Sequence, residues 1–210
     1  MRSHDDFMHD VPTPTTATGP NLNRAHSPAE TADELSRRKK TRTVHPSRCI
    51  CRDWMIVSGN VHYARDKASF TTYTPLNVLL KNNIFNPFDE MQVAGVGRVE
   101  LLVPAAADDA TTLNTLVLED VLHIPEAVCN GFNPLLVGSS MSCGLGCWEG
   151  RDRGGRAMWF GLPFAGMGRL VLATGMGEGE GESELIEGRQ YTLSLYVSPE
   201  EKGVIMAGGR

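Results

Sequence analysis

The sequence predicts an all-β fold, because short apolar segments recur at near-regular spacing from Cys49 onward and turn residues separate them. In the longest of these segments, apolar residues alternate with the period of two that a half-buried strand requires. No internal repeat with a fixed period is present. Together these observations favour one β-barrel or β-sandwich domain over residues 48–198.

The early strands are predicted from their apolar composition and from the turns that bound them. Residues 53–58 form the first strand, and residues 68–73 form a weaker strand or an extended loop that ends at Pro75. Residues 91–103 give the clearest signal, because their apolar residues share one face and a Gly-x-Gly interruption fits a bulge or bend. That face carries Val93, Val99, Leu101 and Val103.

The later strands follow the same rule. Residues 113–123 form a second long strand that ends before Pro125, and we expect it to pair with residues 91–103 as a hairpin. Residues 190–197, with alternating large apolar side chains, supply a last strand before Pro199. The remaining candidates are shorter apolar runs at 133–138, 157–160 and 169–173.

Three segments fall outside this pattern. Residues 1–47 are polar and rich in Pro, Thr and Ser, so they cannot bury enough apolar surface to offset the entropy of ordering, and we expect disorder. Residues 174–188, rich in Gly and Glu, are predicted to be a mobile acidic loop, and residues 199–210 a C-terminal tail. The first segment also holds a basic cluster of Arg37, Arg38, Lys39, Lys40 and Arg42.

Charge and hydropathy limit the classes of function. The chain has a net charge of -5, and residues 49–210 carry seven more acidic than basic residues. Nucleic-acid binding is therefore not expected of the folded domain, although the basic cluster suits a nuclear-localisation signal, a polyanion contact or merely a solvated linker. No apolar run approaches the roughly 20 residues of a membrane span, and no signal peptide is evident. We expect an intracellular protein, cytoplasmic or nuclear, with five cysteines as free thiols.

Several short motifs follow one another in a definite order. Trp54 opens an apolar run that leads to Val57-Ser58-Gly59 and then to His62. A Gly-x-Gly strand follows, then Val-Leu-His-Ile-Pro at 121–125 and Asn-Pro-Leu-Leu at 133–136. The succession resembles the protease-like domain of copia-type retrotransposon Pol polyproteins over residues 50–173, and at most to 197. The resemblance implies a single small β-barrel of the retropepsin-like type.

The catalytic position departs from that family. Val57 stands where the family has its catalytic aspartate, and the hairpin from Ser58 to His62 is one residue shorter than the family's. Aspartic proteases need two carboxylates that share a proton to activate water, and retropepsin-like enzymes obtain them from two subunits. A homodimer of this chain would instead bring two valines together. The resemblance therefore implies a degenerate fungal form with no proteolytic activity and no cofactor, metal or small-molecule ligand.

The first functional hypothesis is accordingly a non-catalytic, retrotransposon-derived remnant or module for binding or self-association. The second is a residual or repurposed hydrolase whose acid comes from Asp53 or Asp66. The third is a nucleic-acid adaptor that uses the basic cluster at residues 37–42.

Two further side-chain patterns contain the residue types of a functional site. Cys49 with Cys51, or Cys143 with Cys147, offers thiolates for zinc, but neither pair has Cys-x-x-Cys spacing, so free thiols are the better interpretation. Ser58 with His62 and His123 contains the residue types of a hydrolase, but the sequence lacks the Gly-x-Ser-x-Gly elbow. Structural roles for these residues are favoured.

Overall fold

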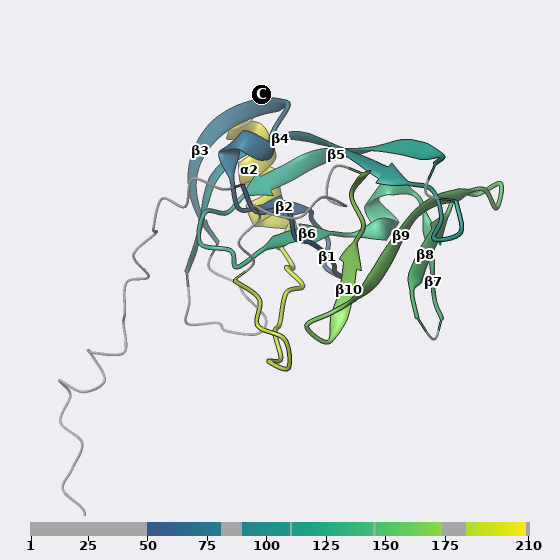
Figure 1. The fold of residues 1–210 in the computed structure, drawn as a ribbon. Helices are drawn as coiled ribbons and strands as arrows, with labels where there is room; N and C mark the ends of the chain where they lie inside the picture. Colours follow the sequence, from purple (N-terminus) through teal and green to yellow (C-terminus); the bar gives the residue numbers. More distant parts are fainter. Residues whose placement is uncertain (1–49, 81–89, 110, 145, 174–183, 209–210) are drawn as a thin grey trace, which may run out of the picture. The chain divides into compact units, whose positions relative to one another are not determined.

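The computed structural model describes one ten-stranded sheet with few helical elements, so the all-β prediction is confirmed (Figure 1). Along the sheet the strands follow the order β3-β4-β5-β2-β6-β1-β10-β9-β8-β7. The structure describes residues 50–80, 90–109, 111–144, 146–173 and 184–208.

The first five strands are β1 (Trp54–Ile56), β2 (Tyr63–Ala64), β3 (Thr72–Leu80), β4 (Met91–Pro104) and β5 (Leu113–His123). The other five are β6 (Asn130–Phe132), β7 (Ser140–Cys143), β8 (Trp148–Arg151), β9 (Ala157–Phe164) and β10 (Met167–Leu170). The helical elements are the 3-10 helices η1 (Lys67–Ser69) and η2 (Pro134–Val137) and the α-helix α2 (Pro199–Gly208).

The two long strands pair as the sequence predicts. β4 and β5 form an antiparallel hairpin from Gly95↔His123 to Pro104↔Leu113, with a register shift between Gly97 and Val99. The shift directly follows the predicted Gly-x-Gly interruption, whose residues 95–97 pair in regular register. The predicted apolar face of β4 is buried: Val93, Val99, Leu101 and Val103.

The sheet is open rather than closed into a barrel. Within the described residues, β3 and β7 are the two edge strands of the sheet, and they do not pair with each other. The prediction of a closed barrel is therefore wrong. Part of the reason lies in the last predicted strand. Residues 190–197 form no strand, and their contacts with the rest of the chain come largely from side chains and isolated backbone bonds. Their predicted alternation is nevertheless present, because Leu193, Leu195 and Val197 are buried.

Two local predictions differ from the structure. Residues 133–138 are not a buried strand, because Asn133 caps η2 with its side chain and Gly138 ends it in the left-handed region at φ 71. Leu135, within η2, is 71% exposed. Pro75 does not end an extended segment, because β3 runs through it as an edge strand, where a residue without an N–H is tolerated.

The predicted terminal segments and the predicted acidic loop can also be compared with the structure. Residues 199–208, expected as a tail, form α2, which buries Ile205 and packs against β3. Residues 1–47 with the basic cluster, and residues 174–183 of the acidic loop, lie outside the described residues. Of that loop, Leu185 is buried and Glu184 pairs with Arg65. Among the described helices, none has the length and hydropathy needed to cross a bilayer.

Candidate functional site

The segment that carries Val57-Ser58-Gly59 leaves the sheet at its middle. β1 pairs in parallel with β6 and antiparallel with β10, so both of its edges are occupied (Figure 1). The ladder continues one step beyond the strand, because the Val57 N–H donates to the Phe132 carbonyl at 2.9 Å. Residues 57–62 then connect β1 to β2, which lie on opposite sides of β6 and do not pair with each other, so the predicted hairpin is a loop. We call residues 57–62 the Val57 hairpin after the sequence motif.

Asn133 holds one side of the Val57 hairpin. Its Nδ2 donates to the Gly59 carbonyl at 2.6 Å, and its Oδ1 accepts from the Leu135 N–H at 2.9 Å. Its backbone N–H donates to Nδ1 of His62 at 3.1 Å. The motif at 133–136 and the motif ending at His62 are thus in direct contact, although about seventy residues separate them in the sequence.

Residues 191–197 hold the other side of the hairpin. The Leu195 carbonyl accepts from the Asn60 N–H at 3.1 Å. The Asn60 side chain bonds both backbone groups of Val197, donating at 2.7 Å and accepting at 2.8 Å. A Cβ placed on Gly59 would lie 2.0 Å from the Leu195 carbonyl oxygen, so only glycine allows this approach.

Two hydroxyl contacts complete this side. Ser58 meets Ser194, with 3.0 Å between the two hydroxyl oxygens and 3.1 Å from the Ser58 N–H to the Ser194 hydroxyl. The buried Tyr63 donates its hydroxyl to the Leu193 carbonyl at 2.7 Å. Ser58 and Gly59 therefore each have a structural role in the contact with residues 191–197.

A cavity of about 340 Å³ opens beside the Val57 hairpin, and we call it the hairpin cavity. Its polar lining comes from Ser58, Asn133 and Ser194. Its apolar lining consists of Ile56, Val57, Pro134, Leu135, Met141, Trp148 and Met167. The volume is at the lower end of the range for small-ligand pockets, which are also mostly apolar with a few polar groups.

None of the described residues that line the hairpin cavity carries a carboxylate. The two acids considered as substitutes are both engaged with arginine. Asp53 accepts from Arg169 at 3.2 Å through Oδ1, while its Oδ2 is buried without a hydrogen bond. Asp66 accepts from the Cys51 N–H at 2.7 Å and from Arg65 at 3.1 Å.

The histidines considered with Ser58 have separate partners. His62 is buried and stacks on Phe132, with 5.9 Å between ring centroids. Burial lowers the pKa of His62 to about 4, and because its Nδ1 accepts a hydrogen bond, the neutral ring carries its proton on Nε2. His123 lies beside the Tyr73 hydroxyl, 2.9 Å away, and burial lowers its pKa as well. The structure therefore does not join these groups into a catalytic relay.

The four cysteines within the described residues do not gather into a metal site. All four within the described residues are free thiols, as the sequence predicts, and Cys49 lies outside those residues. Burial raises the pKa of Cys129 to about 12 and also raises that of Cys51, so both remain protonated at neutral pH. No group of three potential ligands from His, Cys, Asp and Glu occurs in the described part of the chain.

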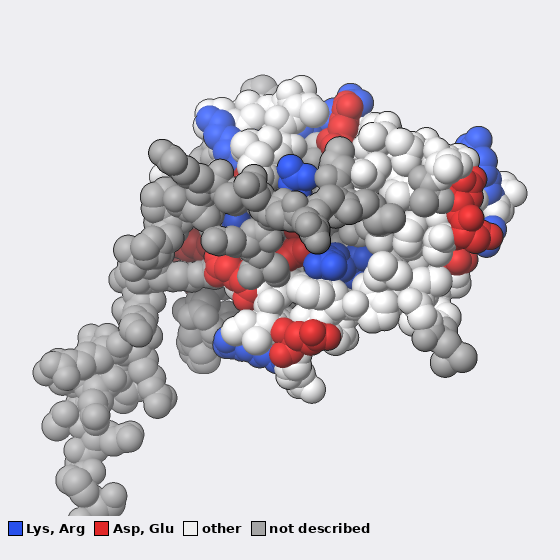
Figure 2. All heavy atoms as spheres, in the orientation of Figure 1, with Lys and Arg blue, Asp and Glu red and all other residues white. Residues whose placement is uncertain are grey.

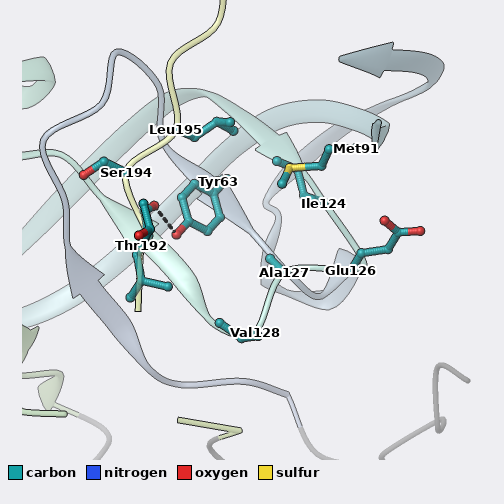
Figure 3. A pocket seen from close by; sticks show the side chains of 10 residues that line it. Tyr63, Met91, Ile124, Glu126, Ala127, Val128, Thr192, Ser194 and Leu195 are labelled. Atoms are coloured by element: carbon teal, nitrogen blue, oxygen red, sulfur yellow. Dashed lines mark hydrogen bonds between the residues drawn. The ribbon is translucent and has the colours of Figure 1, made fainter. Parts of the chain in front are cut away.

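A second, smaller cavity of about 200 Å³ is bordered by residues 192–195 together with side chains from β2 and β4 (Figure 3). Tyr63 is one of its lining residues, and its hydroxyl donates to the Leu193 carbonyl. The labelled side chains around it are mostly apolar, including Met91, Ile124 and Leu195. Its walls include Tyr63, Ile124 and Leu195, which belong to the core cluster that packs against residues 191–197.

Charged side chains do not concentrate in one region of the face in Figure 2, where acidic and basic groups occur in small, mixed clusters. The basic cluster at residues 37–42 lies outside the described residues.

Sequence reasoning did not identify Asn60, Ser194 or Met141 as parts of the site. Asn60 and Ser194 form hydrogen bonds with residues more than 130 positions away, and no local sequence pattern indicates such a contact. Met141 lies in a strand of only four residues, which is too short for a clear periodic signal.

The fold and the site together define a class: a β-sheet domain with a doubly clamped hairpin and an apolar cavity beside it. Comparison of the chain with protein-family models, curated proteins and solved structures found no match.

Proposed function

We propose that this chain is a non-catalytic binding module on a protease-like scaffold, related to the copia-type Pol polyprotein domain and without proteolytic activity. In this proposal, the hairpin cavity receives an apolar side chain of a peptide or protein partner. Val57 occupies the position of the family's catalytic aspartate and contributes an apolar wall instead.

The spatial arrangement of the motifs supports the relationship. The family resemblance rests on a hairpin motif ending at His62 and on an Asn-containing segment at 133–136. In the structure, His62 and Asn133 share a hydrogen bond of 3.1 Å, and Asn133 also holds the Gly59 carbonyl. A chance succession of motifs has no reason to bring these segments into contact.

The observation that carries the function is the lining of the hairpin cavity. Its walls are apolar side chains, and Ser58, Asn133 and Ser194 supply the few polar groups at its border. Leu135 is 71% exposed and Met141 is 50% exposed at its rim. Exposed apolar side chains next to an apolar cavity are typical of a binding surface.

Peptide titration tests this function. The full-length protein is titrated with acetyl-Ala-Leu-Ala-amide and with acetyl-Ala-Glu-Ala-amide, and binding is followed by the NMR signal of the Trp148 indole N–H. That signal is assigned through the Trp148→Phe variant. We expect the leucine peptide to shift the signal and the glutamate peptide to leave it unchanged, because a carboxylate loses hydration in an apolar cavity.

A matched pair of variants separates the cavity from general surface effects. Leu135→Glu places a charge at the cavity rim, whereas Leu162→Glu places the same charge on β9, at a residue 44% exposed that is not part of the lining. Only Leu135→Glu should abolish the response. Equal responses of the two variants, or equal binding of both peptides, would contradict a binding role for the cavity.

The absence of proteolysis is tested separately. The full-length protein is incubated with a broad peptide library at acidic and neutral pH, and we expect no cleavage. Pepstatin-sensitive cleavage would contradict the proposal. The Val57→Asp variant complements this assay, since cleavage restored by one carboxylate per chain would support the protease-like scaffold.

A further inference from the structure

The two edges of the sheet are protected to very different degrees. β3 contains Pro75 and has a register shift between Pro75 and Val78. Each of these features hinders the addition of another strand. β7, reading Ser-Met-Ser-Cys, has no charged residue, no proline and no register shift against β8, and all four of its residues are exposed.

The alternation of hydrogen-bonded pairs along the β7–β8 hairpin shows which backbone groups of β7 do not bond to β8. Gly144 N–H donates to the Cys147 carbonyl at 3.0 Å, so this pair is a hydrogen-bonded one. Hydrogen-bonded pairs alternate along an antiparallel ladder, which makes Ser142↔Glu149 and Ser140↔Arg151 the next two. The backbone N–H and C=O groups of Met141 and Cys143 consequently point to the outer edge of the sheet.

We propose that β7 is a self-association edge, at which a second copy of this chain adds its own β7 in antiparallel orientation. Two-fold symmetry allows this because the same patch then serves both copies. One register satisfies all four outward groups within the strand. In it, Met141 of each copy exchanges two hydrogen bonds with Cys143 of the other, and Ser142 lies on the two-fold axis opposite Ser142.

The side chains suit the same register. Met141 and Cys143 alternate with Ser140 and Ser142, so each Met141 faces a cysteine of the second copy on one surface of the sheet and the two Ser142 hydroxyls meet on the other. No like charges are brought together, because β7 contains none.

The pairing also affects the hairpin cavity. Met141 belongs to its lining, and the partner strand would place Cys143 of the second copy beside Met141. This inference goes beyond the proposed peptide-binding function and does not depend on it. It also differs from a retropepsin-like arrangement in which the two Val57 hairpins meet.

Sedimentation velocity on the full-length protein over a concentration series is the first test. We expect a monomer–dimer equilibrium, with weak affinity because the strand is short and the interface small. Met141→Lys adds a charge at the edge and should leave a monomer. Leu162→Glu changes an exposed apolar residue elsewhere and should leave the equilibrium unchanged.

Cysteine cross-linking tests the register. In a background with Cys49, Cys143 and Cys147 changed to serine, Ser142→Cys places two thiols across the axis. Their Cα atoms would be about 4.5 Å apart, within the range that a disulfide spans. Diamide would accept the two electrons and two protons released as the bond forms. Ser140→Cys is the matched control, since position 140 would face Gly144 of the second copy.

Efficient cross-linking of Ser142→Cys with little of Ser140→Cys supports the proposal. Three results overturn it: a monomer at every concentration, a dimer that persists in Met141→Lys, or equal cross-linking of the two cysteine variants. The peptide titration has a different readout, the NMR signal of the Trp148 indole N–H. Failure of peptide binding and failure of self-association can therefore be told apart.

Discussion

Acidification should destabilise the fold through His62. The side chain is 2% exposed and accepts a hydrogen bond from Asn133 at Nδ1, so a proton at that atom would break the bond and place a charge in an apolar environment. Burial lowers the pKa of His62 to about 4 in the folded chain, whereas an unperturbed histidine has a pKa of about 6.5.

The sign and magnitude follow from these two pKa values. Above about pH 6.5 the ring is neutral in both states and contributes no pH dependence. As the pH falls toward 4 the unfolded chain binds a proton that the folded chain does not, so the free energy of unfolding decreases. The loss amounts to about 2 kcal/mol at pH 5 and approaches about 3 kcal/mol below pH 4.

Urea unfolding of the wild type and of His62→Gln at pH 7 and pH 5 measures this effect. The variant removes the titrating ring, so its free energy of unfolding should fall less between the two pH values, by about 2 kcal/mol. The comparison cancels the contributions of carboxylates and of His123, whose pKa is also lowered. An identical pH dependence in the two proteins would refute the role assigned to His62.

Three substitutions test the clamps on the Val57 hairpin by urea unfolding at neutral pH. Gly59→Ala should cost about 2–4 kcal/mol because its Cβ would collide with the Leu195 carbonyl, whereas Gly203→Ala, which meets no atom within 4 Å, should not destabilise. Tyr63→Phe should cost about 1–2 kcal/mol, since it removes the 2.7 Å bond from a buried hydroxyl. Asn133→Ala should cost about 2 kcal/mol through loss of the η2 cap and of the bond to Gly59. Wild-type stability in any of these three would contradict the corresponding clamp.

Periodic, locally determined elements were predictable from the sequence. β5 has the predicted bounds and β4 differs by one residue, because a long alternating segment can satisfy only one register of burial. The apolar alternation of residues 190–197 correctly predicted which side chains are buried, but it could not show whether a neighbouring strand is available to form a ladder. Burial pattern and strand pairing are separate properties, and the local sequence determines only the burial pattern.

The site was predictable in part for the same reason. Val57, Ser58 and Gly59 were identified because they form a contiguous motif. The identity of their partners depends on contacts across the whole chain, such as those with Asn133 and Leu195. The Asn-Pro-Leu-Leu segment was misassigned as a strand because its apolar composition resembles one, whereas its conformation is set by the Asn133 cap and by Gly138.

The bond between Asn60 and Val197 joins positions 137 residues apart and has a consequence for biosynthesis. During translation, residues 57–62 emerge long before residues 191–197, so the hairpin cannot acquire this support until residues 191–197 have left the ribosome. Contacts between such distant positions form late because loop closure must precede them. The most recognisable motif in the sequence is therefore expected to be among the last parts of the domain to reach its final structure.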